Sequence, residues 1–287
     1  MRTFSFTVDV DRDVNLQIPG RVAAGSIDRG SGDAPRFSST ERGLGILLDI
    51  LDEAGIDGTL FFEGRTAETI DCARASGHRI GLHGYDHEDL TALDDGDLER
   101  VLSRSRDAVR DAAGEPTCFR APYMKVDRRV LDAVHATTGI ADDSSFYTDP
   151  AGPWETYGIG GIREHPVAKS HDSRGKVIAA YLWPMHEGAR GPEDYIRMAE
   201  GIDGDLVIAD HTWHLVETRS SGPMGPEWER RTREDVLNVV CGILDLGFRP
   251  ATLSRRPRFP DLPGPPSDGL PEADPGQFRR DARCPFI

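Results

Sequence analysis

The chain has 287 residues, of which 38% are hydrophobic, and a formal net charge of −15 at pH 7. This length and composition are typical of a soluble globular protein, and one strand-and-helix barrel would accommodate them. The acidic excess argues against a nucleic-acid partner, because a negative surface repels the phosphate backbone. No apolar run approaches the roughly eighteen residues that a membrane-spanning helix needs, so we expect none.

The beginning of the sequence runs directly into a predicted strand and carries no recognisable export signal, so we expect a cytoplasmic protein. The cysteines are scattered and form no Cys-x-x-Cys pair. This spacing favours reduced structural thiols over a zinc knuckle or a disulfide framework. The thiols concerned are Cys72, Cys118, Cys241 and Cys284.

Short β-rich runs alternate with helical patterns, which is typical of a parallel α/β fold. The predicted strands are 4–10, 58–62, 78–82, 117–119, a run near Ile162, and 206–209. The predicted helices are 40–53, 97–112, 127–137 and 227–246. A glycine follows each of these helices at or near the position where a C-terminal cap is expected.

Two stretches interrupt this alternation. Residues 12–39 are rich in Gly, Ser, Arg and Asp, and we expect a loop inserted after the first strand, either a lid over the site or a disordered segment. Residues 256–287 contain many prolines, which predicts an extended tail on the surface or docked onto a neighbouring subunit of a homo-oligomer. The remaining chain, 1–255, is predicted to be a single domain.

The first predicted strand ends in two acids, Asp9 and Asp11, separated by Val10. Side chains alternate along a strand, so both carboxylates are expected on the same face. Two such close negative charges are costly unless a cation or an arginine compensates them. The pair therefore predicts a metal or an arginine nearby, although acids at strand ends also serve as helix caps.

Two histidines, His83 and His87, follow the predicted strand 78–82 and lie four residues apart. Two imidazoles and a carboxylate can bind zinc and leave a coordination position open for water, as catalytic zinc sites do. A helix cap or a solvent-exposed position explains each histidine taken alone. The metal hypothesis therefore depends on the two acids of the first strand.

Two further motifs follow predicted strands. Arg120 and Tyr123 lie in an Arg-x-Pro-Tyr segment, where the arginine can hold a carboxylate ionised and a backbone amide can donate to an oxyanion. A plain turn explains this segment equally well. His211 emerges from an apolar strand and can protonate a departing amine.

Taken in order, the acids of the first strand, His-x-x-x-His, Arg-x-Pro-Tyr and a late strand ending in His resemble the polysaccharide deacetylase (NodB-homology) family. These motifs span residues 4–214. The resemblance implies a distorted (β/α) barrel with its site at the C-terminal ends of the strands. It also implies a divalent metal and hydrolysis of an N-acetyl group from a small-molecule or saccharide substrate.

Position by position, the resemblance implies roles for the matched residues. The metal, usually Zn²⁺ with Co²⁺, Mn²⁺ and Ni²⁺ as alternatives, would be held by Asp11, His83 and His87. Asp9 matches the general base, and Arg120 matches the residue that orients it. Tyr123 matches the donor of a backbone amide to the oxyanion. His211 matches the general acid, with His214 as the alternative.

The usual family motif has adjacent acids, whereas Val10 separates them here. This form resembles a branch that includes certain peptidoglycan deacetylases, allantoinase-like enzymes and an aminoarabinose deformylase, as do segments 143–145 and 162–167. We predict N-deacetylation of an amino sugar or saccharide, with a deformylase or cyclic amide hydrolase as the alternative. A non-catalytic carbohydrate-binding barrel is the alternative of another class.

Overall fold

The structure, a computed structural model, describes residues 2–30, 32–172 and 174–253. The strands of its main sheet are β1 (Thr3–Val10), β4 (Thr59–Phe62), β5 (Arg79–Leu82), β6 (Cys118–Phe119), β7 (Asp142–Asp143), β8 (Tyr157–Ile159), β9 (Ile162–Glu164), β12 (Asp205–His211) and β15 (Arg249–Pro250). Three small antiparallel pairs are β2 (Asn15–Leu16) with β3 (Gly25–Ser26), β10 (Lys169–His171) with β11 (Val177–Ala179), and β13 (Glu217–Thr218) with β14 (Gly222–Pro223).

The α-helices are α1 (Ser38–Ala54), α2 (Gly64–Ala67), α3 (Asp95–Ala113), α4 (Arg128–Thr138), α5 (Trp183–His186), α6 (Pro192–Glu200) and α7 (Pro226–Asp245). Short 3₁₀ helices are η1 (Ala73–Gly77), η2 (Leu90–Ala92), η3 (Pro122–Met124) and η4 (Thr212–Leu215). None of the helices in the described ranges combines the length and the apolar character needed to cross a bilayer. The predicted tail, 256–287, and Cys284 lie outside the described residues.

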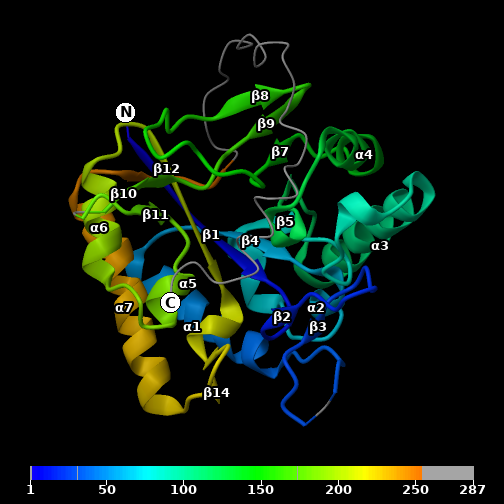
Figure 1. Cartoon of the computed structure of the whole chain (residues 1–287), viewed down its shortest axis with the longest axis horizontal. Coiled ribbons are helices and arrows are strands. Elements are labelled where there is room, and N and C mark those ends of the chain that lie inside the picture. The colour runs from blue at the N-terminus through cyan, green and yellow to red at the C-terminus, as the bar shows by residue number, and fades with distance from the viewer. Residues whose placement is uncertain (1, 31, 173, 254–287) are drawn as a thin grey trace.

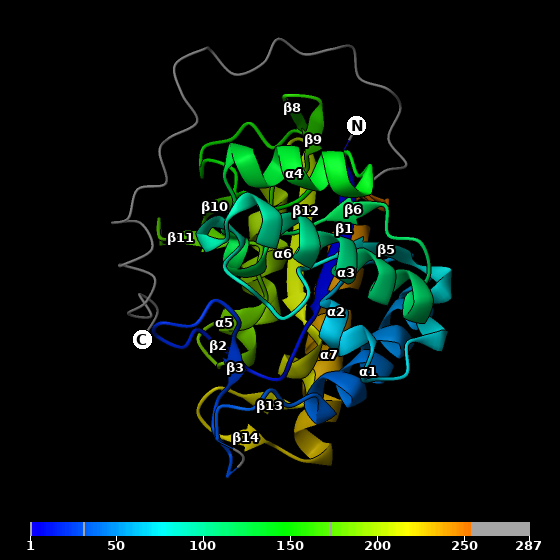
Figure 2. The ribbon, with the colours of Figure 1, turned by 90° about the vertical axis from the view of Figure 1, so that its right-hand side faces the viewer.

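The main sheet is nine-stranded and curled, in the order β12-β1-β4-β5-β6-β7-β9-β8, with β15 also pairing with β1. Within the described residues, β8 and β9 pair antiparallel in this sheet, and the other neighbouring strands are parallel. Helices cover the outside of the curled sheet, with α6 and α7 on one side and α3 and α4 on the other (Figures 1 and 2). The distorted (β/α) barrel predicted from the sequence is confirmed.

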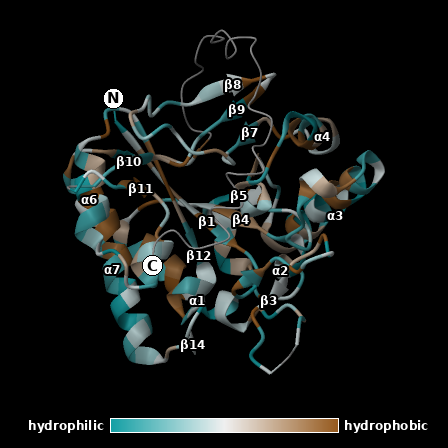
Figure 3. Ribbon diagram, viewed as in Figure 1, coloured by the Kyte–Doolittle hydropathy of each residue, from teal (hydrophilic) through white to brown (hydrophobic). Residues whose placement is uncertain are grey.

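Strand β1 shows how the sequence builds this barrel. Its alternate residues Phe4, Phe6, Val8 and Val10 belong to the main hydrophobic core. The residues between them are polar, and Thr7 and Asp9 both bind Arg120 on the inner side of the sheet. A central strand covered on both faces can place apolar groups against helices and polar groups toward the interior. Hydrophobic segments gather between α1 and α7, and hydrophilic ones on the outward side of α6 (Figure 3).

The four long helices begin and end within two residues of their predicted bounds. The side chain of Asp127 accepts a hydrogen bond from the Val130 amide at 2.9 Å and caps α4. Gly55 and Gly139 adopt the left-handed conformation at the ends of α1 and α4, which glycine reaches without steric cost. The helix α6 was not predicted, since only nine residues carry its amphipathic pattern.

The parallel strands end in register at one edge of the sheet. Val10 pairs with Phe62, Phe62 with Leu82, and Leu82 with Phe119. On the other side of β1, Asp9 pairs with His211. The residues that follow this row therefore project at the same edge, and they are Asp11, Glu63, His83 and Arg120.

The segment predicted as an inserted loop, 12–39, contains the β2 and β3 pair, and its last two residues belong to α1. Asp13 accepts hydrogen bonds from the backbone amides of Ser39 and Thr40 at the start of α1. Arg36 pairs with Glu217 of β13 at 3.0 Å. These contacts tie the segment to the barrel at its N-terminal end and near its C-terminal end, while its role as a lid stays a prediction.

Candidate active site

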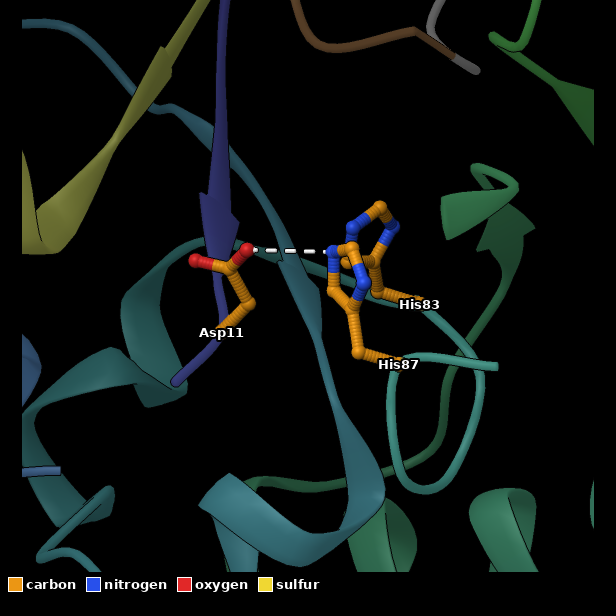
Figure 4. A group of neighbouring side chains, drawn as sticks. All are labelled: Asp11, His83 and His87. Carbon is orange, nitrogen blue, oxygen red and sulfur yellow. Dashed lines mark ion pairs between the residues drawn. The ribbon is translucent and has the colours of Figure 1, made fainter. Parts of the chain in front are cut away.

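Three predicted ligands converge at the C-terminal edge of the sheet. Atoms of Asp11, His83 and His87 that can bind a metal all lie within 4.8 Å of one another. Figure 4 shows the three side chains pointing toward one another from the end of β1 and from the loop after β5. All three are buried, with exposures of 0%, 2% and 2%. Nε2 of His87 lies 3.3 Å from Oδ2 of Asp11.

Neighbouring groups orient these ligands. Nδ1 of His83 lies 2.9 Å from the carbonyl oxygen of Arg120, which can only accept a hydrogen bond. That contact places the proton on Nδ1 and leaves the lone pair on Nε2, as is usual for metal-binding histidines. The side-chain amide of Asn15 donates to Oδ2 of Asp11 at 2.6 Å.

The arrangement fits a cation. Oδ1 of Asp11 and Nδ1 of His87 are buried and have no hydrogen-bond partner among the described residues. Burial raises the pKa of Asp11 to about 7, against the opposing effect of His211 and His83. Burial also lowers the pKa of His87 to about 4, so this imidazole is neutral, which is the form that binds metal. Unpartnered buried polar atoms are costly, and a divalent cation would satisfy the carboxylate.

Asp9 lies beside this cluster in a contrasting environment. Its Oδ1 accepts a hydrogen bond from Arg120 at 2.9 Å, and its Oδ2 accepts one from the hydroxyl of Tyr181 at 2.8 Å. Burial by itself would raise the pKa of Asp9, but Arg120, His83 and His211 together lower it to about 2. Asp9 is therefore ionised at neutral pH and can accept a proton.

Arg120 is fully buried and holds several groups of the interior together. Its guanidinium donates to Thr7 Oγ1 at 2.8 Å and to the carbonyl and hydroxyl oxygens of Ser144, both at 2.9 Å. Its Cζ also lies 4.4 Å from the centre of the Phe61 ring. With the pair to Asp9, these contacts fix the guanidinium in one orientation, which is what a residue that orients the carboxylate requires.

Backbone strain gathers around the same site. The non-glycine residues with positive φ in the described part of the chain are Val14 (43°), His87 (49°), Tyr123 (60°) and Met124 (54°). The ring of Tyr123 meets the ring of His87 edge to face at 4.5 Å. Left-handed backbone at residues with side chains is costly and clusters at functional sites, where the surrounding structure imposes it.

His211 and His214 occupy different positions. His211 contacts the Tyr181 hydroxyl, with Nε2 at 2.9 Å, and its Nε2 lies 3.9 Å from Oδ2 of Asp11. His214 stacks on His186 and lies 3.3 Å from Glu187. Burial lowers the pKa of both imidazoles. Of the two, His211 is the one placed beside both acids of the first strand.

Sequence reasoning did not identify Tyr181, Asn15 or the buried Arg12 as site residues. Arg12 pairs with Glu63 and Asp86, and its backbone amide donates to Glu63 at 2.8 Å. The sequence does carry a signal for Arg12 and Glu63. Glu63 directly follows Phe62 of the registered row, and Arg12 follows Asp11, the residue after Val10. Tyr181 belongs to no motif that points to the site.

Comparison with known proteins shows which family and which proteins this chain resembles. A sequence model of the family described as polysaccharide deacetylase matches residues 27–139. Over these residues the chain is similar to the polysaccharide deacetylase family. The matched segment contains His83, His87, Arg120 and Tyr123. Asp9, Asp11 and His211 lie outside it and reach the site through the fold.

Two curated relatives and one solved structure are also similar to this chain. A chitin deacetylase from Cryptococcus neoformans var. grubii is 32% identical over 188 residues, which make up 59% of this chain and 39% of that protein. A peptidoglycan deacetylase from Helicobacter pylori is 32% identical over 181 residues, or 61% and 54% of the two chains. This chain therefore spans only about two fifths to about half of these relatives.

The solved structure is described as a polysaccharide deacetylase from Mycobacterium smegmatis. It matches with a TM-score of 0.56 at 23% identity and covers 90% of this chain and 95% of its own. This likeness shows the fold.

Proposed function

We propose that this chain is a metal-dependent hydrolase that removes the acetyl group from a nitrogen of an amino sugar or saccharide. The observation that carries the proposal is the buried group of Asp11, His83 and His87 beside an ionised Asp9. The similarity to the polysaccharide deacetylase family over residues 27–139 supports a deacetylase, and the names of the two curated relatives motivate a saccharide substrate.

Asp11, His83 and His87 would hold the cation. A bound Zn²⁺ or similar divalent metal would polarise the scissile carbonyl and acidify the attacking water. One carboxylate and two imidazoles leave coordination positions open, which is the pattern of catalytic sites rather than structural ones.

The other residues move protons and stabilise charge in this proposal. Asp9, held by Arg120, takes the proton of the attacking water, whose oxygen ends in the released carboxylic acid. The backbone amide of Tyr123 donates to the oxygen that becomes negative. His211 gives a proton to the nitrogen as the carbon–nitrogen bond breaks. A lowered pKa makes its protonated imidazole a stronger acid.

The test combines metal content with product release. Elemental analysis of purified wild type should give close to one metal ion per chain, and His83→Ala should lose it. His171→Ala is the matched control, because His171 is the exposed last residue of β10 and belongs to none of the contacts of the site described above. Acetate and formate are then measured after incubation with N-acetylated chitooligosaccharides, a formylated amino sugar and a cyclic ureide.

Each result of this panel decides between functions. Acetate release that depends on His83 supports the proposal. Release of formate alone, or opening of the ureide alone, replaces the acetyl substrate with the alternative acyl group. Sugar binding without bound metal or product contradicts the proposal and favours a binding module. The cytoplasmic location and a homo-oligomer stay predictions, which cell fractionation and light scattering would test.

A further inference from the structure

Tyr181 connects the two proton-handling residues of the site. Its hydroxyl oxygen lies 2.8 Å from Oδ2 of Asp9 and 2.9 Å from Nε2 of His211. The hydroxyl donates to Asp9, and its oxygen faces the imidazole edge that carries both ring nitrogens, with Nδ1 at 3.4 Å. Burial raises the pKa of Tyr181 well above its usual value of 10, so the hydroxyl keeps its proton at neutral pH.

Backbone contacts with β12 and a hydrogen bond from Tyr195 hold Tyr181 in this position. Tyr181 forms an isolated parallel bridge with Ala209 of β12, and the next residue, Leu182, donates its amide to the Ala209 carbonyl at 2.9 Å. The hydroxyl of Tyr195 donates to the Tyr181 carbonyl at 3.0 Å. Tyr181 therefore lies along the free edge of β12, with its hydroxyl directed toward the end of the strand where His211 lies.

The other aromatic rings around His211 form no hydrogen bond with its imidazole among the described residues. The ring is surrounded by Trp183 at 5.8 Å, Trp213 at 5.3 Å and His214 at 5.5 Å between centroids. These rings limit the space around the imidazole. Among the described residues, Tyr181 is the side chain whose hydroxyl lies within hydrogen-bond distance of the ring nitrogens.

We infer that Tyr181 is a positioning residue, whose hydroxyl fixes the imidazole of His211 in the orientation that protonates the departing nitrogen. This inference rests on the proposed function and adds to it a residue that the motifs do not include. Orientation of an acid matters because proton transfer requires hydrogen-bond distance to the accepting atom. The hydroxyl itself gains and loses no proton overall.

The experiment uses two substrates that differ in how much the leaving group needs a proton. Tri-N-acetylchitotriose loses an amine, which must be protonated, whereas 4-nitrophenyl acetate loses a stable phenolate. Tyr181→Phe should lower kcat for the amide by about tenfold or more, because general acid catalysis typically contributes about a hundredfold to ten-thousandfold. KM for the amide and kcat for the ester should stay within about threefold of wild type, because neither depends on the acid and Asp9 keeps its pair with Arg120.

Controls separate positioning from a general loss of structure. Tyr157→Phe removes a hydroxyl from strand β8 and should leave both activities unchanged. Site-dependent ester turnover is taken as the part that Asp11→Ala abolishes. In a His211→Ala background, Tyr181→Phe should have no further effect on the amide, because a residue that acts through His211 has nothing left to position.

Three outcomes overturn the inference. One is an equal loss on amide and ester, which indicates general damage. Another is no loss on the amide, and the third is an additive loss in the double variant. If wild type releases no acetate from the amide, the proposed function fails separately. The imidazole ¹⁵N spectrum then decides the inference, because unchanged His211 signals in Tyr181→Phe contradict the contact with the hydroxyl.

Discussion

Asp9 and Asp11 lie two residues apart at the end of β1, yet the two sides of the site to which they belong are completed differently. On the Asp9 side, both carboxylate oxygens accept hydrogen bonds, from Arg120 and Tyr181. On the Asp11 side, Oδ1 of Asp11 and Nδ1 of His87 have no partner among the described residues. The protein itself supplies hydrogen-bond partners for both oxygens of Asp9. On the Asp11 side, ligand atoms and a negative charge remain that a bound cation would satisfy.

The pKa values follow this difference. Burial favours the neutral form of both acids, but beside Arg120, His83 and His211 the pKa of Asp9 falls to about 2. Without an arginine partner, Asp11 is raised to about 7. Two chemically identical side chains on one strand thus have separate roles in the proposal, one as base and the other as ligand.

The largest expected effect comes from removing the carboxylate on the metal side. Asp11→Ala should lose both bound metal and N-deacetylation, down to background, because two imidazoles alone hold the cation weakly. Elemental analysis and acetate release measure the two losses. A variant that retains full metal and full activity would show that Asp11 is not a ligand.

Asp9→Asn tests the other side of the comparison. It should keep the metal and lower kcat by about a hundredfold to a thousandfold, because the amide cannot take the proton from water. The measurement is kcat together with metal content of the same preparation. Loss of metal in this variant would place Asp9 among the ligands and remove the distinction between the two acids.

Arg12→Met tests the buried ion pairs that Arg12, the residue after Asp11, forms in the interior. Arg12 is fully buried between Glu63 and Asp86, so its loss leaves buried charge unpaired and should lower the free energy of unfolding by about 3–5 kcal/mol. Arg65→Met is the matched control, since Arg65 pairs with the same Asp86 at 43% exposure and should cost about 0–1 kcal/mol. Urea unfolding measures both, and equal effects would contradict the structural role of Arg12.

Asn15→Ala should have the smallest effect. The amide of Asn15 orients Asp11, and outer partners of metal ligands typically contribute about tenfold to a hundredfold in affinity, so we expect about a tenfold weaker Zn²⁺ affinity. Competition with a chromogenic chelator measures it. Asn238→Ala, on the exposed face of α7, is the control that should leave the affinity unchanged. Equal affinities in both variants would show that Asn15 does not orient the ligand.

Positions of the predicted site residues could be read from the sequence where a residue follows a strand whose local pattern is clear. His83 comes directly after β5, and Arg120 directly after β6. Parallel strands end at one edge, so residues at equivalent strand ends converge even when the sequence separates them widely. The assigned roles remain predictions, whereas the convergence of Asp11, His83 and His87 is a feature of the structure.

The sequence by itself determined the alternation of strands and helices, the helix caps and the row of chemically active residues at strand ends. These depend on periods of two and 3.6 residues and on single capping side chains, which are local properties of the chain. Only the tertiary structure decided that Tyr181 meets Asp9, 172 positions away, and that Arg12 lies between Glu63 and Asp86. Such contacts depend on how the curled sheet brings distant segments together, and no local pattern encodes that distance.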